Sequence, residues 1–135
     1  MPETPPEPRG DAKRVMVCDD DESLVDILST LLEAQGYRVS SAHDGPSCFD
    51  VFEAETPDLL ILDLNLPIQN GFVVLEKLRD REKAGNTHLV MLSADERPAD
   101  REMAERLGVH RFVAKPFDCS ELLEYIAETL AKPNG

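Results

Sequence analysis

The sequence contains no tryptophan, three cysteines, and no hydrophobic run of the roughly 20 residues that a membrane-spanning helix requires. Its first residues form no apolar segment of the kind that secretory signal peptides carry. The cysteines, Cys18, Cys48 and Cys119, are odd in number and lack the C-x-x-C spacing of zinc sites. We therefore expect reduced thiols in a cytoplasmic protein, with neither a disulfide framework nor a zinc site.

Positive charge is also scarce. The chain has 14 lysines and arginines but 27 aspartates and glutamates, which gives a net charge of −13. Such a surface repels phosphate backbones, so direct nucleic-acid binding is not expected. The acidity suits a protein that binds cations or docks on basic surfaces of partners. With 135 residues, 41% of them hydrophobic, the chain has the size and composition of one domain with a core.

The two ends differ in composition from the rest of the chain. Residues 1–13 carry four prolines and no apolar periodicity, which predicts a flexible, acidic, proline-rich tail. Residues 14–132 are expected to form one domain. Residues 133–135 are either a C-terminal tail or the start of a linker.

Short apolar runs alternate with amphipathic segments inside this domain. Strands are predicted at residues 14–18, 37–42, 59–62, 89–92 and 111–114, and the run 59–62 (LLIL) is typical of a central strand covered on both faces. Helices are predicted between and after them, and the first should bury the face formed by Leu24, Ile27, Leu28, Leu31 and Leu32. Five strands alternating with five helices predict an α/β fold with a doubly wound, five-stranded parallel sheet.

Polar side chains follow four of the predicted strands. Asp19 and Asp20 follow the first, Asp63 the third, Ser93 the fourth and Lys115 the fifth. Each has a simpler interpretation alone, as a helix cap, a turn residue or a surface lysine. Functional groups of doubly wound sheets gather beyond the carboxyl ends of the strands, so the conjunction predicts one polar site.

This combination supports phosphoryl transfer. Three neighbouring carboxylates repel one another unless a cation binds, and Mg²⁺ prefers such oxygen ligands. Asp63 is then placed to attack a phosphoryl donor and form an aspartyl phosphate. Lys115 and Ser93 are placed to stabilise the charge on the phosphoryl oxygens.

Four motifs carry these residues: VMVCDDDE (15–22), DLLILDLNLPIQNG (58–71), VMLSADE (90–96) and FVAKPF (112–117). Together they resemble the receiver domain of response regulators (CheY-like), which is the phosphoacceptor half of two-component signalling. The resemblance covers residues 14–132 and implies a flavodoxin-like fold with the strand order 2-1-3-4-5.

The resemblance also implies roles for individual residues. Asp63 is the phosphoacceptor, and Mg²⁺ is bound by the carboxylates of Asp20 and Asp63 and by the backbone carbonyl of Asn65. Asp19 acts on the ion largely through a water molecule. Asn70 stands where aspartate is common, a departure with no evident chemical consequence.

Further implied roles concern the phosphoryl group and its readout. Ser93 and Lys115 contact the phosphoryl oxygens, and the bond between Lys115 and Pro116 is expected to be cis. Phe112 occupies the aromatic switch position and is expected to rotate when Ser93 moves towards the phosphoryl group. That rotation changes the face formed by the fourth helix, the fifth strand and the fifth helix. Because Phe112 lacks the hydroxyl of tyrosine, we expect packing alone to set its position.

The resemblance implies a sensor histidine kinase or a histidine phosphotransfer protein as phosphoryl donor, and an unidentified downstream protein as target. The chain is expected to be a monomer or a phosphorylation-dependent dimer, and to catalyse only its own phosphorylation and dephosphorylation. One alternative is a pseudo-receiver that binds partners without phosphorylation, which is disfavoured because no pocket residue is missing. Another is a haloacid-dehalogenase-type phosphatase, which is disfavoured because Asn65 stands where its D-x-D motif has the second acid.

Overall fold

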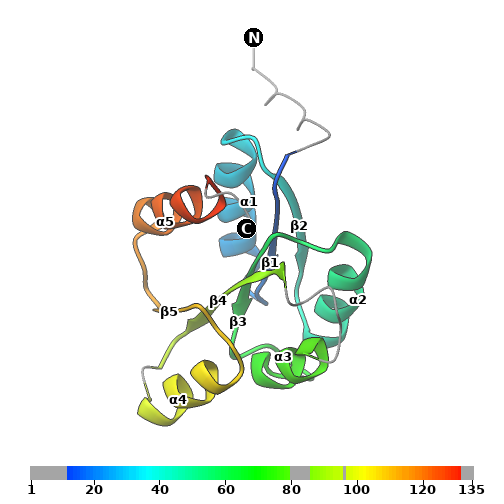
Figure 1. Ribbon diagram of the computed structural model, residues 1–135, viewed down its shortest axis with the longest axis vertical. Coiled ribbons are helices and arrows are strands. Elements are labelled where there is room, and N and C mark those ends of the chain that lie inside the picture. The colour runs from blue at the N-terminus through cyan, green and yellow to red at the C-terminus, as the bar shows by residue number, and fades with distance from the viewer. Residues whose placement is uncertain (1–11, 80–85, 96, 132–135) are drawn as a thin grey trace.

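Strands and helices alternate along the part of the chain that the computed structural model describes, residues 12–79, 86–95 and 97–131. Most of the predicted tail (1–13) and all of residues 133–135 lie outside these ranges. The elements are β1 (Arg14–Cys18), α1 (Glu22–Ala34), β2 (Arg38–Ala42), α2 (Gly45–Glu55), β3 (Leu59–Asp63), α3 (Gly71–Arg79), β4 (His88–Ser93), α4 (Pro98–Arg106), β5 (Arg111–Ala114) and α5 (Cys119–Ala131) (Figure 1).

The five strands form one parallel sheet in the order β2-β1-β3-β4-β5. This order confirms the predicted flavodoxin-like fold. The chain builds outward from β1 to β2, returns to β3 on the other side of β1, and then continues through β4 to β5 (Figure 1). The switch point of the sheet is therefore between β1 and β3, where α/β proteins of this kind place their ligands.

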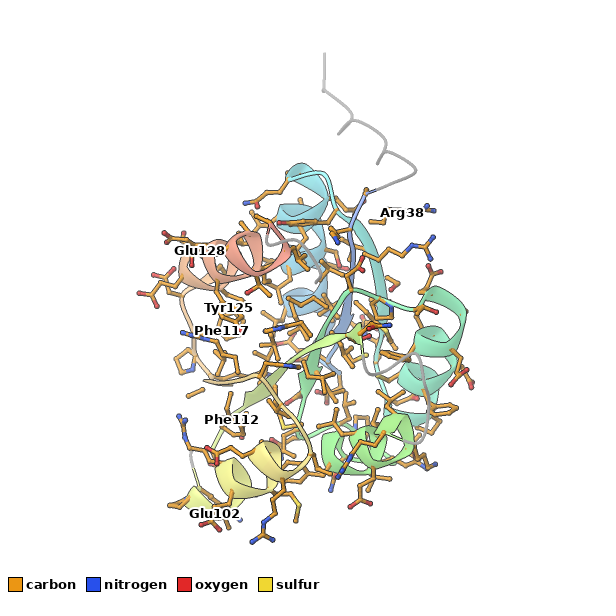
Figure 2. The ribbon with its side chains drawn as sticks, in the orientation of Figure 1. Arg38, Glu102, Phe112, Phe117, Tyr125 and Glu128 are labelled. Atoms are coloured by element: carbon orange, nitrogen blue, oxygen red, sulfur yellow. The ribbon has the colours of Figure 1, made fainter. Side chains whose placement is uncertain are left out.

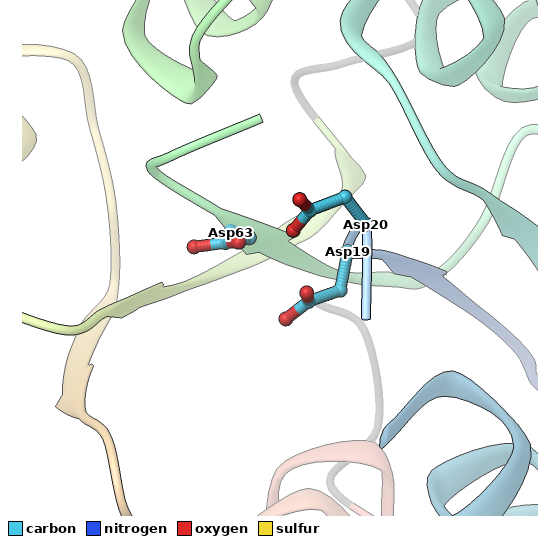
Figure 3. Close-up of side chains that lie close together, drawn as sticks. All are labelled: Asp19, Asp20 and Asp63. Atoms are coloured by element: carbon cyan, nitrogen blue, oxygen red, sulfur yellow. The ribbon is translucent and has the colours of Figure 1, made fainter. Parts of the chain in front are cut away.

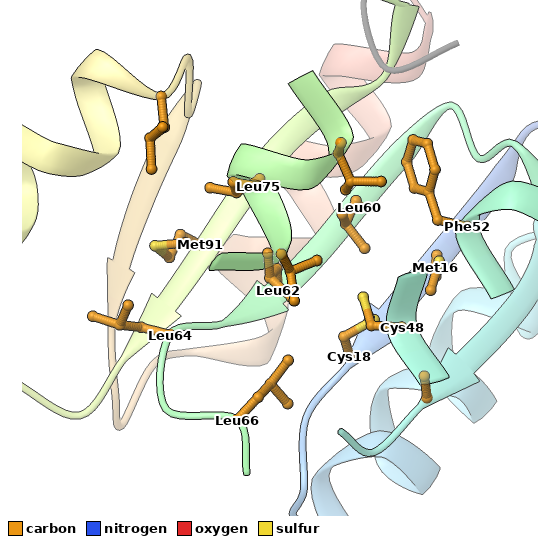
Figure 4. Packing of buried hydrophobic residues seen from close by; sticks show 14 of the residues in the cluster. Met16, Cys18, Cys48, Phe52, Leu60, Leu62, Leu64, Leu66, Leu75 and Met91 are labelled. Atoms are coloured by element: carbon orange, nitrogen blue, oxygen red, sulfur yellow. The ribbon is translucent and has the colours of Figure 1, made fainter. Parts of the chain in front are cut away.

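Alternating side chains of the central strands point to two separate cores. In β3 every residue is buried, and Leu59 and Ile61 pack with residues of α1 and α5. Leu60 and Leu62 point the other way and pack with residues of α2, α3 and α4, including Phe52 (Figure 4). This alternation follows from the twofold period of a strand and produces three layers, helices on both sides of the sheet.

Side-chain caps fix where the helices begin. The carboxylate of Asp21 accepts the backbone N–H of Leu24 at 3.2 Å, and that of Asp44 accepts the N–H of Ser47 at 2.8 Å. Such caps satisfy N–H groups that have no partner inside the helix. No helix within the described ranges combines the length and the apolar character needed to cross a membrane.

The buried face of α1 differs from the prediction. Val25, Leu28 and Leu32 are buried, whereas Ile27 is 52% exposed. The prediction was therefore wrong for Ile27. The apolar residues of α1 occupy a wider part of the helix surface than the part that packs on the sheet. Periodicity alone therefore does not identify which of them remains exposed to solvent.

Two histidines pack together at the sheet edge near α5. The rings of His88 and His110 stack with their centroids 4.2 Å apart, and Nε2 of His88 lies 2.5 Å from the hydroxyl of Tyr125. Burial, with a smaller contribution from the charge of His110, lowers the pKa of His88 from 6.5 to about 4. His88, His110 and Tyr125 therefore form one packed cluster.

This pKa shift predicts that acid weakens the fold through His88. The unfolded chain takes up a proton on His88 below its ordinary pKa of 6.5, while the folded chain resists it until about pH 4. Stability is thus lost as the pH falls between these values, by roughly 1 kcal/mol from about pH 7 to about pH 5 once solvent screening is allowed for. Urea unfolding at the two pH values should show a smaller loss in His88→Gln than in the native protein or in His43→Gln. An equal loss in all three would contradict the role of His88.

Candidate functional site

Three carboxylates converge at the carboxyl end of the sheet. Cys18 of β1 pairs with Leu62 of β3, so the next residues along these strands, Asp19 and Asp63, lie side by side. Oxygen atoms of Asp19, Asp20 and Asp63 lie within 4.8 Å of one another (Figure 3). Asp19 is 0% and Asp63 3% exposed, whereas Asp20 faces solvent.

Lys115 reaches this cluster from the end of β5. Its Nζ donates to Oδ2 of Asp19 at 2.7 Å and lies 3.4 Å from Oδ2 of Asp63. The peptide bond between Lys115 and Pro116 is cis, the isomer that the family resemblance implies. One ammonium group therefore contacts two carboxylates that are far apart in the sequence.

Backbone N–H groups bond the same two carboxylates through their other oxygen atoms. The N–H of Asp21 donates to Oδ1 of Asp19 at 2.9 Å, and the N–H of Asn65 donates to Oδ1 of Asp63 at 3.1 Å. In each case the donor is the residue two positions after the aspartate, so each carboxylate bonds to the backbone of the loop that follows it. These bonds restrict the carboxylates to positions that face the common site.

The pKa of Asp63 is raised above its ordinary value. Burial is the largest cause, and the charge of Asp19 adds to it, against the opposing effects of the Asn65 N–H and of Lys115. For Lys115, burial acts to lower the pKa, but the hydrogen bond to Asp19 and the charges of Asp63 and Asp19 outweigh it, so the pKa is raised. Lys115 is thus firmly cationic, while Asp63 binds a proton more readily than an exposed carboxylate does.

The residues fit a divalent, oxygen-seeking cation. Three carboxylates and one ammonium leave two negative charges in excess in a largely buried cluster. The donors are all oxygen atoms, with no histidine or cysteine among them. Mg²⁺ has both the matching charge and the matching ligand preference.

Close packing behind Asp63 depends on Gly71, the first residue of α3. A Cβ atom at this position would lie 2.8 Å from the backbone oxygen of Asp63 and 3.0 Å from Cα of Leu64. The N–H of Gly71 also donates to the carbonyl of Leu64 at 2.8 Å. The absence of a side chain therefore allows α3 to begin directly against the end of β3 at Asp63 and the residues that follow it.

Ser93 is buried at the end of β4 and bonds to its own loop. Its hydroxyl donates to the carbonyl of Asp95 at 2.7 Å and accepts the N–H of Asp95 at 3.2 Å. The N–H of Lys115 donates to the carbonyl of Ser93 at 2.8 Å, which ties the ends of β4 and β5 together. Ser93 therefore lies at the carboxyl end of β4, and its hydroxyl is hydrogen-bonded to backbone groups of Asp95.

Phe112 is half-buried on β5 and faces α4 (Figure 2). The guanidinium carbon of Arg101 lies over its ring, 5.1 Å from the centroid, and a groove of about 400 Å³ opens beside both residues. A cation over an aromatic face is attracted by the ring quadrupole. The expectation that packing alone sets the position of Phe112 therefore needs correction, because Arg101 adds an electrostatic contact that no sequence signal indicated.

The structure brings together the predicted residues of the acidic site and separates Phe112, the predicted switch residue, from them. Asp19, Asp20, Asp63 and Lys115 form one cluster, and Asn65 touches it through its backbone. Phe112 lies instead on the α4 side of β5. Asp21, the next residue after Asp20, lies outside this cluster of carboxylates and caps α1.

Comparison with known proteins identifies the family. The family model of the response regulator receiver domain matches residues 15–127 of the chain. The chain belongs to this family. A receiver domain is a signalling domain rather than a conventional enzyme. Among solved structures, this chain is 29% identical to the non-phosphorylated HemR receiver domain from Leptospira biflexa. That match has a TM-score of 0.82 and covers 91% of this chain and 98% of the other.

Two further solved structures are similar to this receiver domain. A CheY-like response regulator receiver domain protein from Methanospirillum hungatei JF-1 is 27% identical, with a TM-score of 0.82, over 89% of this chain and 94% of its own. A response regulator from Burkholderia pseudomallei is 26% identical, with a TM-score of 0.75, over 90% of this chain and 75% of its own. The latter structure contains a phosphorylated aspartic acid, a calcium ion and citrate.

Proposed function

We propose that this receiver domain accepts a phosphoryl group on Asp63 and thereby changes the surface formed by α4, β5 and α5. The observation that carries the proposal is the meeting of Asp19, Asp20 and Asp63 with Lys115 at the switch point of the sheet. The phosphoryl donor is a sensor histidine kinase or a histidine phosphotransfer protein, and the target is a further protein. The Burkholderia relative, which carries a phosphorylated aspartic acid, supports this chemistry.

The metal requirement follows from the donor set. The carboxylates of Asp20 and Asp63 and the backbone carbonyl of Asn65 would hold Mg²⁺, with Asp19 acting largely through water. When bound, Mg²⁺ neutralises charge on the phosphoryl oxygens during transfer.

Asp63 supplies the nucleophile. One carboxylate oxygen forms a bond to phosphorus while the bond from phosphorus to the donor nitrogen or oxygen breaks, and the leaving group keeps that electron pair. Lys115 is placed by Asp19 to compensate the negative charge of the phosphoryl oxygens. The N–H of Asn65 holds the other oxygen of Asp63 and so restricts how the carboxylate is presented.

Ser93 and Phe112 then change position in response to the phosphoryl group. To bond a phosphoryl oxygen, the Ser93 hydroxyl must leave the carbonyl of Asp95. That movement vacates space into which Phe112 rotates, and the rotation separates its ring from Arg101. The contact between Arg101 and Phe112 therefore favours the unphosphorylated arrangement.

We expect Arg101→Gln to make the phosphorylated arrangement easier to reach. Beryllofluoride with Mg²⁺ imitates the aspartyl phosphate, and its apparent dissociation constant should fall about twofold to fivefold when a contact worth about 0.5–1 kcal/mol is lost. Isothermal titration calorimetry measures this change. Arg106→Gln, in the same helix, removes the same charge and should leave the constant unchanged. Equal constants for Arg101→Gln and the native protein would exclude a role of Arg101 in the switch.

Labelling with acetyl phosphate tests the proposed function. Intact mass spectrometry should show one added phosphoryl group when Mg²⁺ is present, and none after chelation with EDTA. A pseudo-receiver would acquire no group under either condition. That result, under conditions that label other receiver domains, would overturn the proposal.

A further inference from the structure

The thiols of Cys18 and Cys48 lie against each other inside the protein. Cys18 is the last residue of β1 and Cys48 belongs to α2, and their Sγ atoms are 2.6 Å apart (Figure 4). Ordinary van der Waals contact needs about 3.5–4.0 Å even between carbon atoms. Both are free cysteines, and both side chains are fully buried. The two sulfur atoms therefore lie much closer together than an ordinary packing contact.

We propose that Cys18 and Cys48 form an intramolecular disulfide when the protein meets a two-electron oxidant such as a peroxide. A disulfide bond is about 2.05 Å long, so the sulfur atoms need to approach by only about 0.5 Å. One thiol attacks a peroxide oxygen and becomes a sulfenic acid, and a first water molecule leaves. The second thiol then attacks that sulfur, the S–S bond forms, and a second water leaves with the remaining oxygen. The two thiols lose two electrons and two protons, which the peroxide takes up.

The cross-link would fasten β1 to α2 next to the acidic site. Asp19 follows Cys18 directly, and its N–H donates to the carbonyl of Ala42 at the end of β2, from which the chain enters α2. At the start of α2, a Cβ atom on Gly45 would lie 2.5 Å from the backbone oxygen of Gln69. The N terminus of α2 is thus pressed against the loop that follows β3, and the disulfide would hold this arrangement together.

Because the sulfur atoms are already in contact, the bond requires little movement of Asp19. We therefore expect the oxidised protein to accept a phosphoryl group at a rate within about twofold of the reduced protein. Its stability should change much more, because the cross-link closes the loop between positions 18 and 48 in the unfolded chain. The melting temperature should rise by about 10 °C. This inference concerns the fold and holds whether or not Asp63 is phosphorylated.

Complete burial also determines the rate of the reaction. A peroxide reaches these thiols only when α2 transiently separates from the sheet, so oxidation of the native protein should be slow. A low concentration of urea, below the unfolding transition, should accelerate it. The same burial should protect the finished disulfide from reductants.

The test combines oxidation with counting of thiols. The protein is incubated with hydrogen peroxide, unfolded, alkylated with iodoacetamide and examined by intact mass and peptide mapping. We expect one alkyl group, on Cys119, and a cross-linked peptide pair containing Cys18 and Cys48. In the control Cys119→Ser the same pair should form with no alkylation. In Cys48→Ala no intramolecular pair should form and the rise in melting temperature should disappear.

A second preparation removes the access barrier. The protein is unfolded, and refolded in a buffer of reduced and oxidised glutathione. A Cys18–Cys48 disulfide that forms here but only slowly in the native protein supports the proposal, with burial as the barrier. Alkylation of all three thiols after both treatments would overturn it. So would sulfinic acid on either buried cysteine, or a disulfide that contains Cys119.

Discussion

Replacing Lys115 with methionine should lower the rate of phosphorylation by acetyl phosphate about 10²–10³-fold, the usual effect of removing one group that stabilises charge in a transition state. Lys115 is the cation that contacts both Asp19 and Asp63. Methionine retains much of the side-chain volume and removes the charge. The rate is measured by quenching samples over time and determining the phosphorylated fraction by intact mass.

The same substitution should affect the fold through a separate route. Without the ammonium group, two largely buried carboxylates lose their shared partner, so the metal-free protein should melt at a lower temperature. Lys115→Arg keeps the charge and should recover part of this loss. Arg79→Met removes a charge from the exposed end of α3 and serves as the matched control. A Lys115→Met protein that is folded and is labelled as fast as Arg79→Met would show that Lys115 has no role in the transfer.

Replacing Asp19 with asparagine should weaken Mg²⁺ binding about 10–100-fold, which is typical when a group that acts on the ion through water or orients its ligands is lost. Asp19 is fully buried, contributes one of the three carboxylates and holds Lys115 at 2.7 Å. The substitution removes negative charge while it preserves size. Isothermal titration calorimetry with MgCl₂ measures the dissociation constant directly.

Thermal unfolding provides a second readout of the same site. Mg²⁺ binds the folded protein and should raise its melting temperature, and the increase at a fixed Mg²⁺ concentration should shrink in Asp19→Asn. Asp26→Asn changes the same charge on the exposed side of α1 and should behave as the native protein does. An unchanged dissociation constant in Asp19→Asn would mean that the ion binds without Asp19.

Much of the fold could be predicted because its elements are determined locally. The apolar run 59–62 indicates a doubly covered strand from composition alone, and the structure places it at the centre of the sheet. Asp44 and Pro46 mark the start of α2 through a cap and a restricted φ angle, which are properties of neighbouring residues. The order of the strands, by contrast, came from the family resemblance, since periodicity does not specify which strands pair.

The acidic site could be anticipated because parallel strands end at one edge. Asp19, Asp63 and Lys115 each follow a strand directly, so any parallel sheet brings them to the same side. Which strands lie next to each other decides whether the groups touch. The register that places Cys18 opposite Leu62 brings Asp19 beside Asp63.

Contacts between elements that are distant in sequence escaped prediction. Arg101 meets Phe112 only because α4 packs over β5 in one orientation, and Cys18 meets Cys48 only because α2 lies on that face of β1. An arginine in a charged helix and a cysteine in a strand carry no local sign of these partners. For the same reason the exposure of Ile27 depends on where α1 meets the sheet.

The identity of the phosphorylated residue is the central claim, and reductive trapping tests it most directly. The receiver domain is labelled with acetyl phosphate and Mg²⁺ and treated with sodium borohydride, which reduces an aspartyl phosphate to homoserine, and the peptides are sequenced by mass spectrometry. We predict homoserine at position 63, and none at Asp19 or Asp20 or in the Asp63→Asn protein. Homoserine at Asp19 or Asp20, or a labelled protein that retains an intact Asp63, would contradict the account.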